Sequence, residues 1–151
     1  MTPRYVVVEA SVAVKWLVLE HSSDRALALL GDCLQGDQTL GGPPHLLGEC
    51  TSAIFQRYRS VDPTKHMDRA ATELALAQLL AYPIEIISPP GLYEPALDFA
   101  VTHRLSAVYD ALYIVLAQML GAELWTADRR LLTALASAAP WVRDFAGYPA
   151  P

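Results

Sequence analysis

The segment "VVVEASVAVKW", residues 6–16, joins a short apolar run to small residues and then to apolar positions at helical spacing. The β-branched run within residues 5–8 predicts a short buried strand. Val14 and Leu17 then continue a helical pattern. The segment therefore predicts a junction at which a strand turns into a helix, with a single carboxylate, Glu9, at the junction.

The rest of the chain continues this alternation of strand and helix patterns. Helices are expected over 24–36, 45–59, 62–82, 92–103, 106–121 and 129–139, and further strands over 38–40, 84–87, 123–128 and 141–143. Asp24, Asp62 and Ser106 are expected at helix starts, and Gly36 and Gly121 at helix ends. Strands that alternate with helices in one chain predict an α/β fold with a parallel sheet.

The length of 151 residues and the 53% hydrophobic content suit one well-packed domain, expected over 1–147 with a tail over 148–151. The two cysteines, Cys33 and Cys50, are too few for a disulfide framework and are expected to be buried thiols. No apolar run is long enough for a membrane span, and the first residues lack a signal-peptide pattern. We therefore expect a cytoplasmic protein.

The formal net charge of −5 disfavours broad, nonspecific binding to nucleic acid, which depends on Lys and Arg. Local basic groups remain, comprising Arg57, Arg59, Lys65 and Arg69 in one stretch and Arg129 and Arg130 in another. Each group fits either a solvated helix face or a rim that contacts phosphates.

Four carboxylates are candidates for a shared site. Glu9 and Asp128 end two predicted strands, Asp110 lies at a helix start, and Glu49 lies beside an apolar helix stripe. Open parallel sheets bind ligands at the carboxyl ends of their strands. Acids gathered there would repel one another unless they were protonated or bridged by a cation.

The expected cation is Mg²⁺ or Mn²⁺, since hard cations prefer oxygen ligands and no His or Cys joins the set. Taken singly, each acid also has a structural explanation. Asp110 and Asp128 favour helix N-termini through the macrodipole, and Glu49 fits a side chain facing water.

With these residues in view, the chain resembles the PIN-domain ribonucleases, and among them the toxins of VapBC-type toxin-antitoxin pairs. The similar segments are "VVVEASVAVKWLVLE" (6–20), "PPHLLGECTSAI" (43–54) and "LSAVYDALYIVLAQMLGAELWTADRRLL" (105–132). The resemblance covers nearly the whole chain. It implies a three-layer α/β/α domain around a central, mainly parallel sheet.

The resemblance also implies roles for individual residues. The family's catalytic, metal-binding acids fall on Glu9, Glu49, Asp110 and Asp128. Hydroxyl or small polar residues near the metal fall on Ser11, Ser52 and Thr126, although each hydroxyl also fits a helix or turn cap. The first acid is usually Asp in this family, so Glu9 adds one methylene at a position where catalytic geometry matters.

The implied activity is hydrolysis of RNA phosphodiesters by an endoribonuclease that depends on Mg²⁺ or Mn²⁺. Arg129, Arg130 and Arg57 are the candidate RNA contacts. The implied partners are a VapB-type antitoxin, often with a basic side chain near the acidic pocket, and a second copy of the chain. The alternative favoured by Glu9 is a weakened or inactive module that binds RNA or an antitoxin. A phosphatase is disfavoured, because no second acid follows two residues after Glu9.

Overall fold

Five parallel strands form the central sheet of the computed structural model, which describes residues 2–151. The strands are β1 (Arg4–Val8), β2 (Gln38–Gly42), β3 (Ile84–Ile86), β4 (Glu123–Thr126) and β5 (Val142–Asp144). They lie in the order β3-β2-β1-β4-β5, and each neighbouring pair is parallel. The prediction of a mainly parallel sheet is confirmed, and every strand pair follows it.

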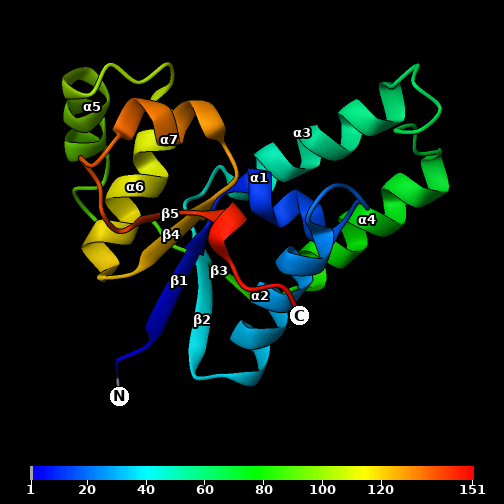
Figure 1. Cartoon of the computed structure of the whole chain (residues 1–151), viewed down its shortest axis with the longest axis horizontal. Coiled ribbons are helices and arrows are strands. Elements are labelled where there is room, and N and C mark those ends of the chain that lie inside the picture. Colours follow the sequence, from blue (N-terminus) through cyan, green and yellow to red (C-terminus); the bar gives the residue numbers. More distant parts are fainter. Residues whose placement is uncertain (1) are drawn as a thin grey trace.

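Helices cover both faces of this sheet. They are α1 (Ala10–Ala13), α2 (Ser23–Gln35), α3 (Leu46–Arg59), α4 (Arg69–Ala81), α5 (Tyr93–Thr102), α6 (Val108–Leu120) and α7 (Arg129–Leu135), with short 3₁₀ turns at Val14–Trp16 and Phe145–Gly147. Figure 1 shows α1 to α4 on one side of the sheet and α5 to α7 on the other. The expected three-layer α/β/α architecture is confirmed.

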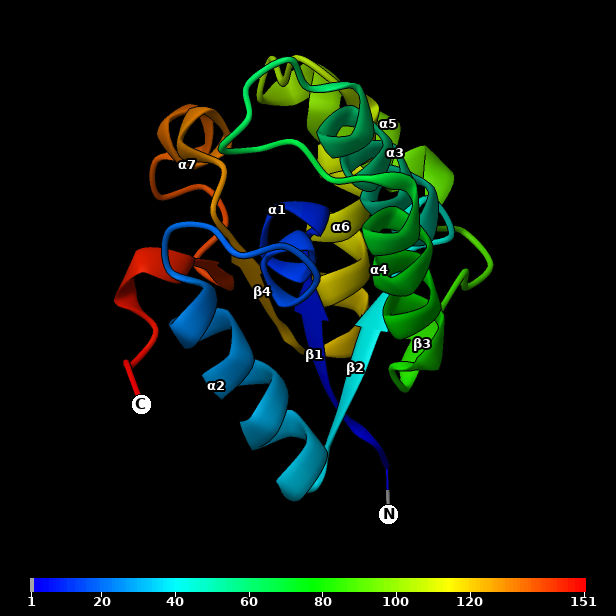
Figure 2. The same ribbon diagram turned by 90° about the vertical axis from the view of Figure 1, so that its right-hand side faces the viewer.

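The strand order reverses between β1 and β4. The connections from β1 to β2 and from β2 to β3 run one way across the sheet, whereas β4 and β5 lie on the opposite side of β1. Right-handed crossovers therefore place the two sets of helices on opposite faces. Figure 2 shows β1 beside β4, with α1 above the carboxyl end of β1. Such a reversal leaves a crevice at the carboxyl ends of the two strands.

The main core lies between the sheet and the helices that cover it. Residues 6–8 of β1 and Leu124 of β4 are buried, as are residues 111–117 of α6. Helix α6 is buried over most of its circumference because α5 covers its outer side and forms a second apolar cluster with it. The packing thus fixes α6 against β1 and β4.

Helix α4 begins at Arg69, later than the expected start at Asp62. The Asp62 carboxylate instead stabilises a turn by accepting a hydrogen bond from the backbone N–H of Thr64 at 2.9 Å. Asp68 caps α4 by accepting from the N–H of Ala71 at 2.8 Å. Two Asp residues in one segment both fit a helix cap, and the second one has this role.

Two other expected starts also shift. The residue before α2 is Ser22, so Asp24 lies in the first turn, where its charge still favours the helix dipole. Helix α6 follows Ala107, which leaves Ser106 outside the helix. The expected end at Gly121 is confirmed, and its φ of 60° is the left-handed conformation that glycine adopts most readily. None of the helices in residues 2–151 is long and apolar enough to cross a membrane.

Replacing Leu124 should strongly destabilise the fold, because its side chain is fully buried at the centre of β4. We expect Leu124→Ala to lower the free energy of unfolding by about 2–5 kcal/mol, measured by urea denaturation followed by circular dichroism. Leu19→Ala is the matched control, since Leu19 is 93% exposed. A Leu124→Ala variant as stable as this control would contradict the assigned core.

Candidate metal centre

Three of the predicted acids meet near the carboxyl ends of β1 and β4. Glu9, Asp110 and Asp128 each offer one carboxylate oxygen, and these oxygens all lie within 4.8 Å of one another. Glu9 directly follows β1, Asp128 follows β4, and Asp110 lies in the first turn of α6. We call these residues the three-acid cluster. It combines two strand ends and one helix start that are distant in the sequence.

Two hydroxyls hold the carboxylate of Glu9, whose residue is only 6% exposed. The hydroxyls of Thr126 and Ser11 both donate to Oε2 of Glu9, that of Ser11 at 3.2 Å. Oγ of Ser11 in turn accepts from the N–H of Ala127 at 3.1 Å, and Oγ1 of Thr126 accepts from the N–H of Asp128 at 3.0 Å. These hydrogen bonds join the end of β1 to the end of β4.

The electrostatics of the cluster favour a bound proton or cation. Burial raises the pKa of Glu9 to about 7, and the charges of Asp110 and Asp128 add to the effect, whereas the Thr126 and Ser11 hydroxyls oppose it. Burial likewise raises the pKa of Asp110 to about 6, with further contributions from Asp128 and Glu49. Carboxylates that are this close and this buried resist ionising together.

Asp128 combines two functions that the sequence left as alternatives. Its Oδ1 caps α7 by accepting from the N–H groups of Arg130 at 2.8 Å and Leu131 at 3.1 Å. The same residue contributes an oxygen to the three-acid cluster. A carboxylate has two oxygens and several lone pairs, so the cap and the cluster are compatible.

Glu49 lies outside the three-acid cluster, although it is close enough to raise the pKa of Asp110. Its Oε1 accepts a hydrogen bond from the hydroxyl of Tyr113 at 2.9 Å. Nε2 of His45 lies 3.3 Å from the same oxygen. Burial is the main cause that lowers the pKa of His45, and burial also raises that of Tyr113.

Sequence reasoning missed Tyr113 and His45 as neighbours of the site. The spacing carries a signal for both, because His45 directly precedes α3 and lies four residues before Glu49, and Tyr113 follows Asp110 by three residues on α6. Residues at these spacings share a helix face. The surface of the site therefore includes His45 beside Glu49 and Tyr113 beside Asp110 as well as the acids themselves.

The remaining predicted residues are more peripheral. Ser52 is exposed on α3, and no hydrogen bond within residues 2–151 joins it to the acids. Arg57 pairs with Glu20, which also accepts from Nζ of Lys15 at 3.0 Å. Arg129 pairs with Asp144, whereas Arg130 is exposed and has no ion pair in the described chain. Arg130 is thus the most available of the three arginines.

The donor set fits a hard divalent cation. The cluster consists of carboxylates supported by hydroxyls, and neither His nor Cys belongs to it in the part of the chain that the structure describes. Oxygen ligands of this kind suit Mg²⁺ or Mn²⁺ better than Zn²⁺. The raised pKa values of Glu9 and Asp110 are consistent with such a site, because burial and, to a lesser extent, the neighbouring carboxylates make the charged forms unfavourable without a cation.

A cavity of about 360 Å³ opens beside the cluster. It is lined by Ala10, Ser11, Val14, Lys15, Glu20, Glu49, Ala53 and Ala127. Its wall includes Glu49 and Ser11, the residue that donates to Glu9, so the cavity lies next to the three-acid cluster.

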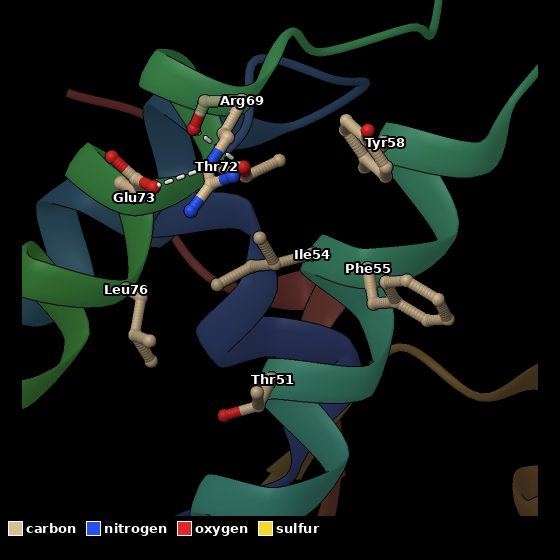
Figure 3. Close-up of a pocket in the computed structure, with 8 residues that line it drawn as sticks. All are labelled: Thr51, Ile54, Phe55, Tyr58, Arg69, Thr72, Glu73 and Leu76. Atoms are coloured by element: carbon tan, nitrogen blue, oxygen red, sulfur yellow. Dashed lines mark hydrogen bonds and ion pairs between the residues drawn. The ribbon is translucent and has the colours of Figure 1, made fainter.

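A second groove, of about 310 Å³, lies between α3 and α4. It is lined by Thr51, Ile54, Phe55, Tyr58, Arg69, Thr72, Glu73 and Leu76, and Figure 3 shows Ile54 pointing from α3 toward α4. Arg69 and Glu73 form an exposed ion pair of 2.7 Å on its α4 wall. None of the four candidate acids lines this groove, so it is a separate, mainly apolar surface.

Comparisons with known proteins support the fold. The family model for the PIN domain matches residues 6–136, a range that includes all four candidate acids. The crystal structure of PAE2754 from Pyrobaculum aerophilum aligns with a TM-score of 0.60 at 24% identity, over 89% of this chain and 87% of that one. At this identity, the likeness supports the fold alone. No curated protein sequence matches the chain.

The metal-free protein should lose stability as the pH rises. The pKa of Glu9 is raised from 4.5 to about 7, so the folded state retains a proton that the unfolded state releases. The resulting free-energy cost grows between these values and is complete above pH 7. We expect a loss on the order of 2–3 kcal/mol between about pH 5 and about pH 8. Urea denaturation with a chelator present measures it.

Glu9→Gln removes one of the two carboxyl groups with a raised pKa and should reduce this pH dependence, making the variant more stable than the natural protein at about pH 8. Excess Mn²⁺ should also reduce the slope, because it binds the ionised form. An unchanged slope in Glu9→Gln would contradict the assignment of the titration to Glu9.

Proposed function

The chain belongs to the PIN-domain family, and on that premise we propose that it is a metal-dependent endoribonuclease that hydrolyses RNA phosphodiester bonds. PIN domains are generally nucleases that use divalent metal ions. The observation that carries the proposal is the convergence of Glu9, Asp110 and Asp128 near the carboxyl ends of β1 and β4. Three neighbouring carboxylates, among which Glu9 and Asp110 have raised pKa values, are typical of a catalytic site.

In this proposal the three-acid cluster holds Mg²⁺ or Mn²⁺. Such an ion supplies an activated water and offsets negative charge on the phosphoryl oxygens. Thr126 and Ser11 hold the Glu9 carboxylate in place through their hydroxyls. Glu49 adds a fourth negative charge beside Asp110, where it favours binding of the ion.

The RNA approaches through the cavity lined by Ser11 and Glu49. We assign a phosphate contact to Arg130, since it is exposed at the start of α7 beside Asp128. Arg129 and Arg57 would have to share their charge with Asp144 and Glu20. With a net charge of −5, binding depends on these local contacts.

A second candidate function, a module that binds RNA or a partner without cleaving RNA, is favoured by Glu9. The extra methylene relative to Asp changes how the carboxylate reaches a metal ion, and small displacements can cost on the order of a hundredfold in rate. Against this alternative, the Glu9 carboxylate still lies within 4.8 Å of those of Asp110 and Asp128. We therefore favour the active enzyme.

We further propose that the enzyme is the toxin of a toxin-antitoxin pair, located in the cytoplasm, that pairs with a second copy of itself and is neutralised by a VapB-type antitoxin. The similarity of three sequence segments to such toxins supports this role. The groove between α3 and α4 is the surface that we assign to the antitoxin. Its apolar floor suits an apolar segment, and the Arg69–Glu73 pair at its wall suits flanking charges.

Asp110→Asn should abolish RNA cleavage, because it removes one carboxylate charge from the three-acid cluster with little change in shape. We expect a loss on the order of a hundredfold or more in the rate of metal-dependent cleavage, measured with a fluorescent RNA and purified protein. Asp98→Asn is the matched control, since Asp98 is an exposed acid on α5. Activity that survives both Asp110→Asn and Asp128→Asn would refute the nuclease assignment.

Glu9→Asp distinguishes the enzyme from the binding module. We expect the natural protein to cleave RNA and Glu9→Asp to need more Mn²⁺, because the shorter side chain withdraws from Thr126 and from the cluster. The concentration of Mn²⁺ at half-maximal cleavage measures this effect. An inactive natural protein that gains activity on Glu9→Asp would instead support the binding module.

Phe55→Glu should prevent neutralisation by the antitoxin, because it places a charge in the apolar groove. The measurement is growth of cells that express the protein together with its VapB-type antitoxin. Phe55 is half-exposed, so folding should persist. Leu74→Glu, at an exposed residue of α4 that does not line the groove, is the control. Equal neutralisation of both variants would exclude this surface.

A further inference from the structure

The carboxylate of Glu49 has two polar neighbours on the same oxygen. The hydroxyl of Tyr113 donates to Oε1 at 2.9 Å, and Nε2 of His45 lies 3.3 Å from that oxygen. Tyr113 is fully buried, so its hydroxyl has little freedom to bond elsewhere. Nε2 of His45 is buried as well and makes no hydrogen bond of good geometry. Both groups therefore act on Glu49 from inside the protein.

The rings of these neighbours are fixed by packing. His45 meets Tyr113 edge-on at 4.8 Å between ring centroids and meets Tyr109 at 5.1 Å. Aromatic groups packed in this way have few alternative rotamers. The two groups that contact Glu49 are thus held rigidly, whereas the Glu49 side chain itself is 40% exposed and lines a cavity.

We propose that Tyr113, assisted by His45, is a positioning residue that keeps Glu49 out of the set of direct metal ligands. The three-acid cluster already contains Glu9, Asp110 and Asp128, and Glu49 stands outside it while bonded to Tyr113. A hydrogen bond to a charged acceptor is among the stronger ones, so it restrains this carboxylate. The inference rests on the proposed metal-dependent function and deepens it.

The competing explanation is that Glu49 merely satisfies a buried tyrosine hydroxyl. The two explanations differ in what happens when the hydroxyl is removed. If Tyr113 restrains Glu49, the freed carboxylate turns toward the cation and binds it more tightly, in a geometry that does not suit catalysis. If Glu49 only satisfies Tyr113, metal binding does not change.

Tyr113→Phe tests the inference by titration calorimetry with Mn²⁺ and no RNA. We expect the dissociation constant for Mn²⁺ to fall severalfold, because an additional charged oxygen ligand becomes free to bind the ion. In a Glu49→Gln background, the same substitution should leave the dissociation constant unchanged. Tyr109→Phe is the matched control, because Tyr109 contacts His45 but does not bond Glu49. An unchanged or higher dissociation constant in Tyr113→Phe would overturn the proposal, as would an equal fall in the Glu49→Gln background.

Two further measurements separate this inference from its premise. The rate of RNA cleavage at saturating Mn²⁺ should fall about tenfold in Tyr113→Phe, with little change in KM. If the natural protein binds Mn²⁺ but cleaves no RNA, the nuclease proposal fails while the calorimetric comparison still decides the role of Tyr113. His45→Gln, at a less buried position, should change Mn²⁺ binding in the same direction if Tyr113→Phe folds poorly.

Discussion

The parallel pairing of β1 with β4 is the constraint on which the site depends. Val8 pairs with Trp125 in the last register position, so Glu9, directly after β1, and Thr126, the last residue of β4, lie at the same level. The hydroxyl of Thr126 can therefore donate to Glu9, and Asp128 follows two residues later. Because the strand order reverses here, α1 and α6 diverge to opposite faces and leave space for acids between them.

In this arrangement, the buried carboxylate of Glu9 costs electrostatic free energy at the centre of a well-packed domain. Glu9 is nearly as buried as the valines that precede it, and its charge is opposed both by burial and by neighbouring carboxylates. The hydroxyls of Ser11 and Thr126 reduce that cost but do not cancel it. A buried carboxylate whose charge is unfavourable is typical of a functional site, since packing alone would favour an apolar residue at this position.

The sequence predicts the order and type of the elements well, because strand and helix periods differ clearly in this chain. It also predicts Glu9, Asp110 and Asp128 at one edge, since strand ends and helix starts are local features. It fails where local signals compete, as at Asp62 and Asp68, which both suit a helix cap. It indicates only weakly that Glu49 lies apart from the other three acids. The hydrogen bond that holds Glu49 comes from Tyr113 and joins α3 to α6, which are distant in the sequence.

Helix α6 carries Asp110 in its first turn and Tyr113 one turn further. Helix α5 packs against the outer side of α6 through a separate apolar cluster. The helix therefore holds Asp110 of the three-acid cluster and Tyr113, which bonds Glu49, at a fixed spacing of three residues. The apolar contact between α5 and α6 thus helps to set the position of both side chains, although it contributes no carboxylate to the site.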